Sequence, residues 1–234
     1  MKESKNLTSH QLIQFDKEEA KDGYHLIGID EAGRGPLCGP VVTAAVILPS
    51  IKGTSEELLK FINDSKKFAG KESLREQIYD RLLETGCFYA IDEGTIEEID
   101  QYNIYQTTYI SMKRAYDKVL QQIGDEKHKV LIDGKAIIKT IPFHVPQVGV
   151  VKGDSKSLCI AAASILAKVY RDRLMAKISK EFPQYNWQKN KGYPTKEHVE
   201  AIRTYGRCKY HRKSFKVKGL DADKVVKTYN SGYR

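Results

Sequence analysis

The sequence predicts a three-layer α/β fold in which helices cover both faces of a mixed β-sheet. Two apolar, β-branched stretches, residues 25–31 and 41–48, come first and are joined by a short glycine-rich loop, which predicts an antiparallel hairpin. Strand-like and helix-like segments then alternate, as is typical of parallel strands connected by helices. With 234 residues and a hydrophobic content of 41 %, the chain can bury the core of a compact domain.

The first part of the chain predicts the hairpin and the helices around it. Residues 1–22 are polar, so we expect a lead-in with a short helix at 11–20. The loop at 33–36 contains two glycines and a proline, which interrupt regular structure and separate the two hairpin strands. Helical periodicity follows at 56–62 and 73–84.

The second part predicts the alternating strands and helices. Thr95 and Glu98 have the spacing of a capping box, which indicates that a helix begins there. The apolar residues of the last long helix recur at helical spacing, so we interpret them as a stripe that faces the core. We expect strands at 88–92, 129–133 and 145–151, and helices at 107–122 and 155–180.

The chain after Phe182 has no strand pattern and reads as loops around one helix at 195–205. We therefore divide the sequence into a lead-in at 1–22, a core at 23–182 and a C-terminal segment at 183–234. The core carries the strand and helix pattern, and the C-terminal segment forms a small helical part beside it.

The net charge of +9 is concentrated in the C-terminal segment, where residues 186–218 contain ten lysines or arginines and two glutamates. Such a surface attracts the phosphates of a nucleic acid, and aromatic rings between the charges offer stacking platforms. A merely solvated basic face remains an equal alternative. The interleaved aromatic residues are Trp187, Tyr193, Tyr205, Tyr210 and Phe215.

The composition also restricts the compartment. Four cysteines lie far apart without a C-x-x-C pair, which argues against a zinc site or a disulfide framework. The longest apolar run, residues 41–48, is too short to span a bilayer, and the N-terminus is polar. We expect a cytoplasmic protein that is a monomer and has no membrane partner.

Four carboxylates stand at or just after predicted strand ends: Asp30, Glu31, Asp133 and Asp154. Strand ends on one edge of an α/β sheet meet at a crevice, so these side chains can gather there. Gathered carboxylates need cations, and oxygen ligands favour Mg²⁺ or Mn²⁺ over zinc. Two such ions would suit phosphodiester hydrolysis.

Each carboxylate also has a structural interpretation. An acid next to glycine after a strand is often a turn former, and Asp154 precedes a helix that it could cap. Asp30 and Glu31 are neighbours in a strand, whose side chains normally point to opposite faces. Composition alone therefore leaves the metal site as a hypothesis.

The loop Gly33-Arg34-Gly35 follows the acid pair directly. Its glycines would let the backbone approach a ligand closely, and Arg34 adds a donor fork. The spacing fits neither a dinucleotide-binding loop nor a P-loop. A plain hairpin turn is the alternative, but a turn does not require an arginine between glycines, so we favour ligand contact.

Taken together, five ordered motifs resemble the bacterial ribonuclease HII family over about residues 24–216. The resemblance implies an RNase H-like fold with a C-terminal helical part. It also implies an endonuclease that cuts the RNA strand of RNA-DNA hybrids and cuts 5′ to single ribonucleotides in duplex DNA, leaving 3′-OH and 5′-phosphate ends. The motifs are G-I-D-E-A-G-R-G-P, D-S-K-K, I-D-G-K, V-K-G-D-S-K-S-L-C-I-A-A-A-S-I-L-A-K-V-Y-R-D-R and K-G-Y-P-T-K-E-H.

The resemblance also assigns roles to individual residues. By position, Asp30, Glu31, Asp133 and Asp154 match the family's ligands for two divalent ions. Gly33, Arg34 and Gly35 match the loop that contacts the ribonucleotide 2′-OH, the group that distinguishes RNA from DNA. Tyr193 matches the tyrosine that packs on the sugar of the DNA side, and Lys66 matches a phosphate contact. Pro194 and Cys38 depart from the common glycine and alanine, and Pro194 could shift the backbone beside Tyr193.

Two other functions fit parts of the pattern. Another nuclease or resolvase on the same fold would keep the acids without needing the Gly-Arg-Gly loop or Tyr193. A non-catalytic binder would rely on the basic segment alone. Cleavage of a duplex with a single ribonucleotide separates the first from the expected enzyme, and a requirement for divalent ions separates the second.

Overall fold

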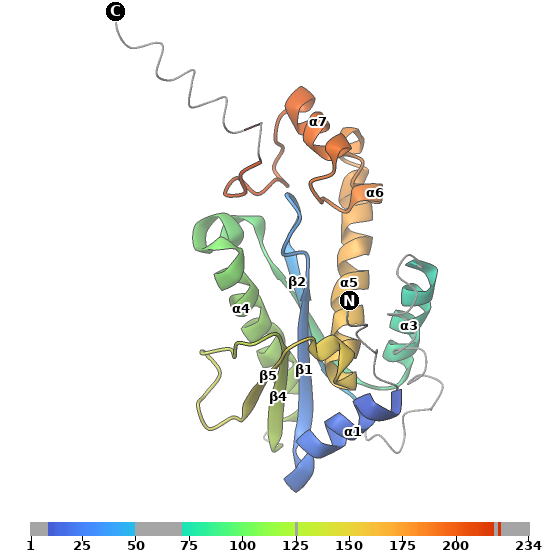
Figure 1. Cartoon of the computed structure of the whole chain (residues 1–234), viewed down its shortest axis with the longest axis vertical. Helices are drawn as coiled ribbons and strands as arrows, with labels where there is room; N and C mark the ends of the chain where they lie inside the picture. The colour runs from blue at the N-terminus through green and yellow to red at the C-terminus, as the bar shows by residue number, and fades with distance from the viewer. Residues whose placement is uncertain (1–8, 50–71, 125, 218–219, 221–234) are drawn as a thin grey trace, which may run out of the picture.

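The computed structural model describes residues 9–49, 72–124, 126–217 and 220 (Figure 1). Residues 56–62, for which the sequence predicts a helix, lie outside these ranges. Within the described part of the chain, no helix is both long enough and apolar enough to cross a membrane.

Five strands form one mixed sheet, as predicted, in the order β3-β2-β1-β4-β5. The hairpin strands β1 and β2 are antiparallel, and β3 continues this pattern at one edge. β4 lies parallel to β1, and β5 lies parallel to β4. The strands are β1 (His25–Ala32), β2 (Val41–Ile47), β3 (Phe88–Gly94), β4 (His128–Asp133) and β5 (Gln147–Val150).

Helices cover both faces of the sheet, which confirms the three layers (Figure 1). Helix α4 (Ile96–Ile123) packs on one face, where Ile27 and Ile29 of β1 join its buried side chains in one apolar cluster. Helix α5 (Leu158–Ser179) packs on the other face. It approaches β1 so closely that a Cβ added to Gly28 would lie 2.3 Å from the carbonyl carbon of Cys159. Helices α1 (Ser9–Glu19) and α3 (Glu72–Glu84) flank α5.

Helix α4 covers both the helix predicted to begin at Thr95 and the helix predicted at 107–122. Thr95 caps its first turn in the predicted capping box with Glu98. The helix then breaks at Asn103, whose φ is +68°. The Asn103 side chain accepts hydrogen bonds from the backbone N–H groups of Tyr105 and Gln106 at 3.0 and 3.1 Å. Asn103 therefore caps the second stretch of helix and sets its direction.

Helix α5 begins later than predicted. A 3₁₀ turn, Gly153–Ser155, comes first, and the helix starts at Leu158 with Ser157 as its N-cap. The Ser157 Oγ accepts a hydrogen bond from Ile160 N at 3.3 Å. The interpretation of Asp154 as the cap of this helix is therefore wrong.

The C-terminal segment is more ordered than predicted. Helix α7 (Lys196–Tyr205) matches the expected helix, with Thr195 as its cap. The preceding stretch, predicted as a loop, contains a 3₁₀ turn, Pro183–Tyr185, and the short helix α6 (Trp187–Asn190). Both helices lie near the C-terminal end of α5, and α7 stands above the β1–β2 connection (Figure 1).

A separate apolar cluster joins this segment to the core. It contains Leu37 and Cys38 from the β1–β2 connection and Met175 from α5, together with Trp187 and Ile202. The interpretation of the interleaved aromatic residues as possible stacking platforms is wrong for Trp187, which is fully buried. Tyr193 and Tyr205, with 44 % and 63 % of their surface exposed, remain available.

Candidate active site

Three of the four candidate acids stand at neighbouring strand ends. Asp30 and Glu31 lie near the C-terminal end of β1, and Asp133 is the last residue of β4. β1 and β4 are parallel with Ile29 opposite Ile132, so the acids that follow these two residues come side by side. The parallel pairing thus brings together side chains from distant parts of the sequence.

The environment of Asp30 and Glu31 opposes their ionisation. Asp30 is only 5 % exposed, and burial raises its pKa well above the usual value, with further contributions from the charges of Glu31 and Asp133. Burial also raises the pKa of Glu31, an effect that Arg34 reduces and Asp133 increases. Buried, mutually repelling carboxylates are the arrangement that a bound cation stabilises.

Asp30 and Glu31 interact despite the alternation of strand side chains. Asp30 lies on the α5 side, where Ser164 hydrogen-bonds to it, and its Oδ1 also accepts a hydrogen bond from Glu31 N at 2.7 Å. Glu31 lies in register with Thr43, on the α4 side. Both acids nevertheless feel the charge of Asp133. The two carboxylates therefore lie on opposite faces of β1, as alternation requires, and a metal site that they share stays a prediction.

The fourth acid, Asp154, belongs to a turn that is tied to Asp133. The backbone N–H of Gly153 donates a hydrogen bond to Asp133 Oδ1 at 2.6 Å, and Asp154 is the next residue. Among the described residues, no three His, Cys, Asp or Glu side chains are already arranged to hold an ion. The four-carboxylate metal site therefore stays a prediction, although an all-oxygen donor set fits Mg²⁺ or Mn²⁺.

The Gly-Arg-Gly loop requires its first glycine. Gly33 has a φ of +94°, and a Cβ at this position would lie 2.0 Å from Arg171 Nε. Arg34 turns back toward the acids, with its Nη1 donating to Glu31 Oε1 at 3.3 Å. A Cβ at Gly35 would lie 3.5 Å from Tyr193 Cε1, so the loop packs against the ring of this tyrosine.

Two buried arginines that the sequence interpretation missed hold this loop in place. Arg212 was counted with the basic surface, but it is fully buried, so that prediction is wrong for this residue. Burial, and to a smaller extent the charge of Arg171, lower its pKa to about 9. Arg212 donates hydrogen bonds to four carbonyl oxygens of the β1–β2 connection, those of Gly33, Arg34, Pro36 and Gly39, at 2.6 to 3.1 Å.

Arg171 of α5 holds the next part of the same connection. It donates to the carbonyl oxygens of Cys38 and Pro40, at 3.0 and 3.1 Å, and to that of Lys191 beside Tyr193, at 3.0 Å. The R-D-R end of the long helix motif contained this residue. Its role could not be seen there, because carbonyl acceptors leave no signal in a sequence.

The backbone of Tyr193 is fixed by a series of buried hydrogen bonds through two histidines. His198 accepts from Trp187 Nε1 at 3.0 Å, and its Nδ1 donates to the Tyr193 carbonyl oxygen at 2.9 Å. His211 accepts from Cys208 N on Nδ1 at 3.0 Å, and its Nε2 lies 3.2 Å from His198 Nε2. Burial lowers the pKa of both histidines, that of His211 to about 4. Both rings are therefore neutral near pH 7, each in the tautomer that these partners require.

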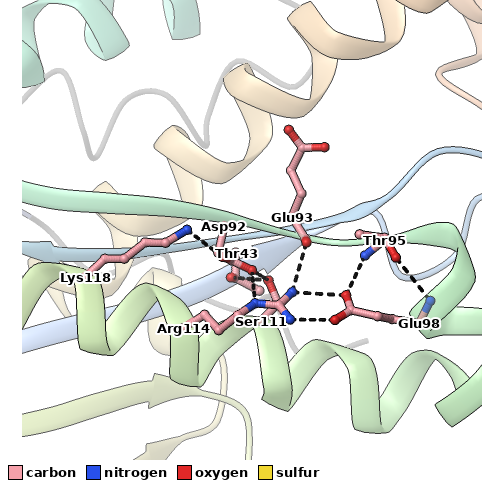
Figure 2. Close-up of polar contacts among 8 residues, drawn as sticks. All are labelled: Thr43, Asp92, Glu93, Thr95, Glu98, Ser111, Arg114 and Lys118. Carbon is pink, nitrogen blue, oxygen red and sulfur yellow. Dashed lines mark hydrogen bonds and ion pairs between the residues drawn. The ribbon is translucent and has the colours of Figure 1, made fainter.

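A buried polar row anchors α4 beside the acids (Figure 2). Across the sheet, Thr43 lies opposite Glu31 on one side and Asp92 on the other. Ser111 of α4 hydrogen-bonds to Thr43 at 2.8 Å and to Asp92 at 3.0 Å. These bonds fix the middle of α4 over the strands that lead into the site.

Ion pairs extend this row along α4, as Figure 2 shows. Arg114 Nε donates to Asp92 at 2.8 Å, and its two terminal nitrogens donate to Glu98. Lys118 donates to the other oxygen of Asp92 at 2.6 Å. The buried charge of Asp92 is thus matched by two cations, and the capping residue Glu98 is joined to the middle of its own helix.

Comparison with known proteins gives a consistent result. The family model described as ribonuclease HII matches residues 27–218. Ribonuclease HII of Pelodictyon phaeoclathratiforme is 45 % identical over 193 residues, which is 82 % of this chain and 90 % of that protein. The length of the match shows that the similarity includes the site and the C-terminal segment up to residue 218.

Solved structures share the fold. Ribonuclease H2 from Pyrococcus horikoshii OT3 has a TM-score of 0.67 at 23 % identity, over 88 % of this chain and 99 % of that one. Bst-RNase HIII in complex with Mn²⁺ has a TM-score of 0.60 at 18 % identity, over 86 % of this chain and 66 % of that one. These similarities confirm the RNase H-like fold that the sequence motifs implied.

The predicted site residues thus fall into three groups. Asp30, Glu31 and Asp133 interact with one another, and Gly33, Arg34, Gly35 and Tyr193 form a contiguous surface beside them. Asp154 is linked to them through the turn at Gly153. Lys66, the predicted phosphate contact, lies outside the described residues.

Proposed function

Because the chain belongs to the ribonuclease HII family, we propose that it cuts duplex DNA on the 5′ side of an embedded ribonucleotide, leaving 3′-OH and 5′-phosphate ends. The family itself supplies the broader activity. Its members are type 2 ribonucleases H, nucleases that hydrolyse the RNA strand of RNA-DNA hybrids. The finer activity rests on which residues stand beside the acids.

The acids would hold the catalytic metal. Asp30, Glu31, Asp133 and Asp154 are the ligands we assign to two Mg²⁺ or Mn²⁺ ions, and Bst-RNase HIII, which shares the fold, was solved with Mn²⁺. When bound, such ions activate a water molecule and stabilise the leaving 3′ oxygen of a phosphodiester. The protein contributes acids whose burial and repulsion favour cation binding, and it contributes a rigid strand edge that fixes their spacing.

The Gly-Arg-Gly loop and Tyr193 would select the ribonucleotide. The loop consists of Gly33, Arg34 and Gly35, and the absence of a side chain at Gly35 leaves room for a sugar and its 2′-OH to approach the backbone. Tyr193 packs directly against Gly35 and is 44 % exposed. A sugar stacked on this ring would have no room for a 2′-OH, which fits a DNA residue on the 3′ side. We assign Lys66 a phosphate contact.

The catalytic and substrate-binding roles would fall to different parts of the chain. We propose that residues 23–182 form the catalytic core and that residues 183–234 form the segment that contacts substrate, preceded by a lead-in at 1–22. Exposed lysines and arginines of the C-terminal segment, such as Lys189, Lys196 and Arg203, would contact duplex phosphates. We expect the protein to act as a monomer in the cytoplasm.

The observation that carries the proposal is the contiguous surface formed by the interacting acids, the Gly-Arg-Gly loop and the ring of Tyr193. The decisive assay uses a DNA duplex with one ribonucleotide and a matched all-DNA duplex, each with Mg²⁺, with Mn²⁺ and with a chelator. We expect a single cut 5′ to the ribonucleotide that requires a divalent ion. Cutting of all-DNA would favour a different nuclease, and binding without any cleavage would favour a non-catalytic protein.

A further inference from the structure

A hollow of about 430 Å³ opens between the N-terminal half of α4 and the connection from β4 to β5. Tyr105 and Tyr109 line it from the helix, and Lys135, Ile137 and Lys139 line it from the connection. Helix α4 and this connection lie on the side of the sheet away from α5 and α6 (Figure 1). The hollow is therefore separate from the Tyr193 surface.

One wall of the hollow lies close to Glu31, one of the candidate acids. Tyr109, which forms part of its wall, lies within electrostatic range of Glu31 and Arg34. Its pKa is raised to about 12, first by burial, then by Tyr105, with a smaller contribution from Glu31. On the other wall, Lys135 follows Asp133 by two residues. A nucleic-acid strand that extends from the acids in this direction would therefore enter the hollow.

The hollow is lined by exposed cations and aromatic rings, the residue types that bind a nucleic-acid strand. Lys135 and Lys139 are exposed, and neither forms an ion pair or side-chain hydrogen bond within the described part of the chain. Tyr105 is 47 % exposed, and its ring centre lies 4.9 Å from that of Tyr109. Ile137 is 46 % exposed beside them. Cations without a protein counter-ion attract phosphates, and exposed rings stack on bases or sugars.

We propose that this hollow binds the cleaved strand on the 5′ side of the scissile phosphate. The proposal rests on the function proposed above, because the polarity of the strand comes from the roles of Tyr193 and the Gly-Arg-Gly loop. Gly35 packs against Tyr193, Arg34 donates a hydrogen bond to Glu31, and Glu31 lies within electrostatic range of Tyr109, so the loop, the acids and the hollow follow one another.

The strand direction follows from this order. The DNA sugar on Tyr193 lies 3′ to the ribonucleotide, and the loop takes the ribonucleotide itself. The phosphate on the 5′ side of the ribonucleotide then reaches the acids. The next nucleotides in the 5′ direction enter the hollow, where Lys135 and Lys139 neutralise their phosphates and Tyr105 stacks on a base or sugar.

The test combines protein variants with two substrates. One duplex carries a single ribonucleotide with a long DNA stretch on its 5′ side, and the other has the cleaved strand shortened to one nucleotide on that side, with the opposite strand kept whole. With the long substrate, the double variant Lys135→Ala/Lys139→Ala should raise KM much more than it changes kcat. The salt dependence of log KM should become shallower by about two, since each lost phosphate contact contributes about one. Tyr105→Ala should raise KM by about fivefold or more, as expected for one lost stacking contact.

The shortened substrate decides whether the upstream strand is the occupant. The wild-type protein should bind it more weakly than the long one, and none of the three substitutions should weaken it further. Lys17→Ala, which removes an exposed lysine of α1, serves as the matched control and should behave as wild type with both substrates.

Two results would overturn the proposal. The first is a wild-type KM for the double variant on the long substrate. The second is an equal loss of binding on both substrates, which would mean that the lysines contact the opposite strand or another part of the duplex. A wild-type protein that cuts neither duplex contradicts the proposed function instead. In that case, the affinities of the same two duplexes, measured with a chelator present, still decide whether the hollow holds the 5′ side of the strand.

Discussion

The ring of Tyr193 lies over Gly35, so close that a Cβ atom added to the glycine would come to 3.5 Å from Tyr193 Cε1. Gly33, two residues earlier, meets the Arg171 side chain instead, with an added Cβ at 2.0 Å from Nε and a φ of +94°. The two glycines of the loop are therefore required for different reasons. Gly33 is needed for the protein to fold as it does, whereas Gly35 keeps the space in front of the tyrosine open.

This difference predicts opposite phenotypes for two matched substitutions. Gly33→Ala should lower the free energy of unfolding by more than about 2 kcal/mol, because alanine is strained at positive φ and displaces Arg171. Gly35→Ala should change it by less than about 0.5 kcal/mol, since 3.5 Å is an ordinary contact. It should nevertheless reduce cleavage at a ribonucleotide by about tenfold or more, because the methyl group occupies the place of the substrate sugar. Urea unfolding and single-ribonucleotide cleavage measure the two effects. A Gly35→Ala protein with normal cleavage would remove this loop from substrate recognition.

The interaction of Asp133 with Asp30 and Glu31 leads to the second prediction. Asp133→Asn should reduce cleavage by at least about a thousandfold, since several kcal/mol of metal-dependent stabilisation of the transition state would be lost. Duplex binding should persist, because phosphate contacts come mainly from other residues. In a chelator, the variant should melt at a higher temperature than the wild type, because the asparagine still accepts from Gly153 while one of the repelling charges is gone. Equal melting temperatures in the chelator would show that the acids are too far apart to repel.

The carbonyl contacts of Arg212 lead to the third prediction. Arg212→Lys keeps the charge but loses the planar fork, so several of its four hydrogen bonds to the β1–β2 connection cannot form. The free energy of unfolding should fall by about 3 kcal/mol. Under conditions where the variant is fully folded, its preference for a ribonucleotide duplex over all-DNA should also fall. Lys213→Ala removes a charge at the next, exposed position and should change neither quantity. A variant that is less stable but equally selective would limit Arg212 to a role in folding.

Much of the fold could be predicted, because it depends on local pattern. The hairpin strands, the Thr95 capping box and the helix that Thr195 caps all match the structure. The errors occur where a side chain outside the pattern decides the outcome. Asn103 breaks α4 and caps the stretch that follows, which extends the second predicted helix toward the N-terminus. Ser157 takes the capping role that the sequence suggested for Asp154.

The site was predictable to the extent that motifs carry it. The acids and the Gly-Arg-Gly loop could be named from the sequence, but the residues that support them could not. Arg212 and Trp187 stand in the most basic segment of the chain, where composition suggests exposure, yet both are buried. Their partners are backbone carbonyls and a histidine ring. A charged residue that binds carbonyl groups has no charged partner by which a sequence could reveal it.

The ion pair between Arg114 and the buried Asp92 leads to the fourth prediction. Arg114→Ala should lower the free energy of unfolding by about 1–2 kcal/mol, a value reduced by the partial exposure of the arginine and by the remaining contact of Asp92 with Lys118. Lys113→Ala is the control, since it removes an ion pair with the half-exposed Asp117 on the same helix and should cost less than about 0.5 kcal/mol. Chemical unfolding of both variants makes the comparison. Equal losses would mean that the polar row in Figure 2 adds nothing beyond surface charge.

The last prediction concerns Asp16 of α1, which accepts a hydrogen bond from Cys159 N at 3.0 Å near the start of α5. Burial raises its pKa from 3.8 to about 6. Between these two values the folded protein holds a proton that the unfolded chain has released, so this residue makes the protein less stable as pH rises through that window. Above pH 6 the cost is on the order of 3 kcal/mol, as 1.36 kcal/mol per pKa unit implies.

Asp16→Asn keeps an acceptor for Cys159 without the charge. The variant should therefore be more stable than the wild type at pH 8, and the advantage should shrink on acidification and vanish near pH 4. His211 titrates with the opposite sign, because its folded pKa of about 4 lies below the usual value and its contribution is lost as pH falls. That effect is common to both proteins, so the difference between their urea unfolding free energies from pH 4 to 8 isolates Asp16. A difference independent of pH would mean that Asp16 is ionised at the same pH in the folded and the unfolded chain.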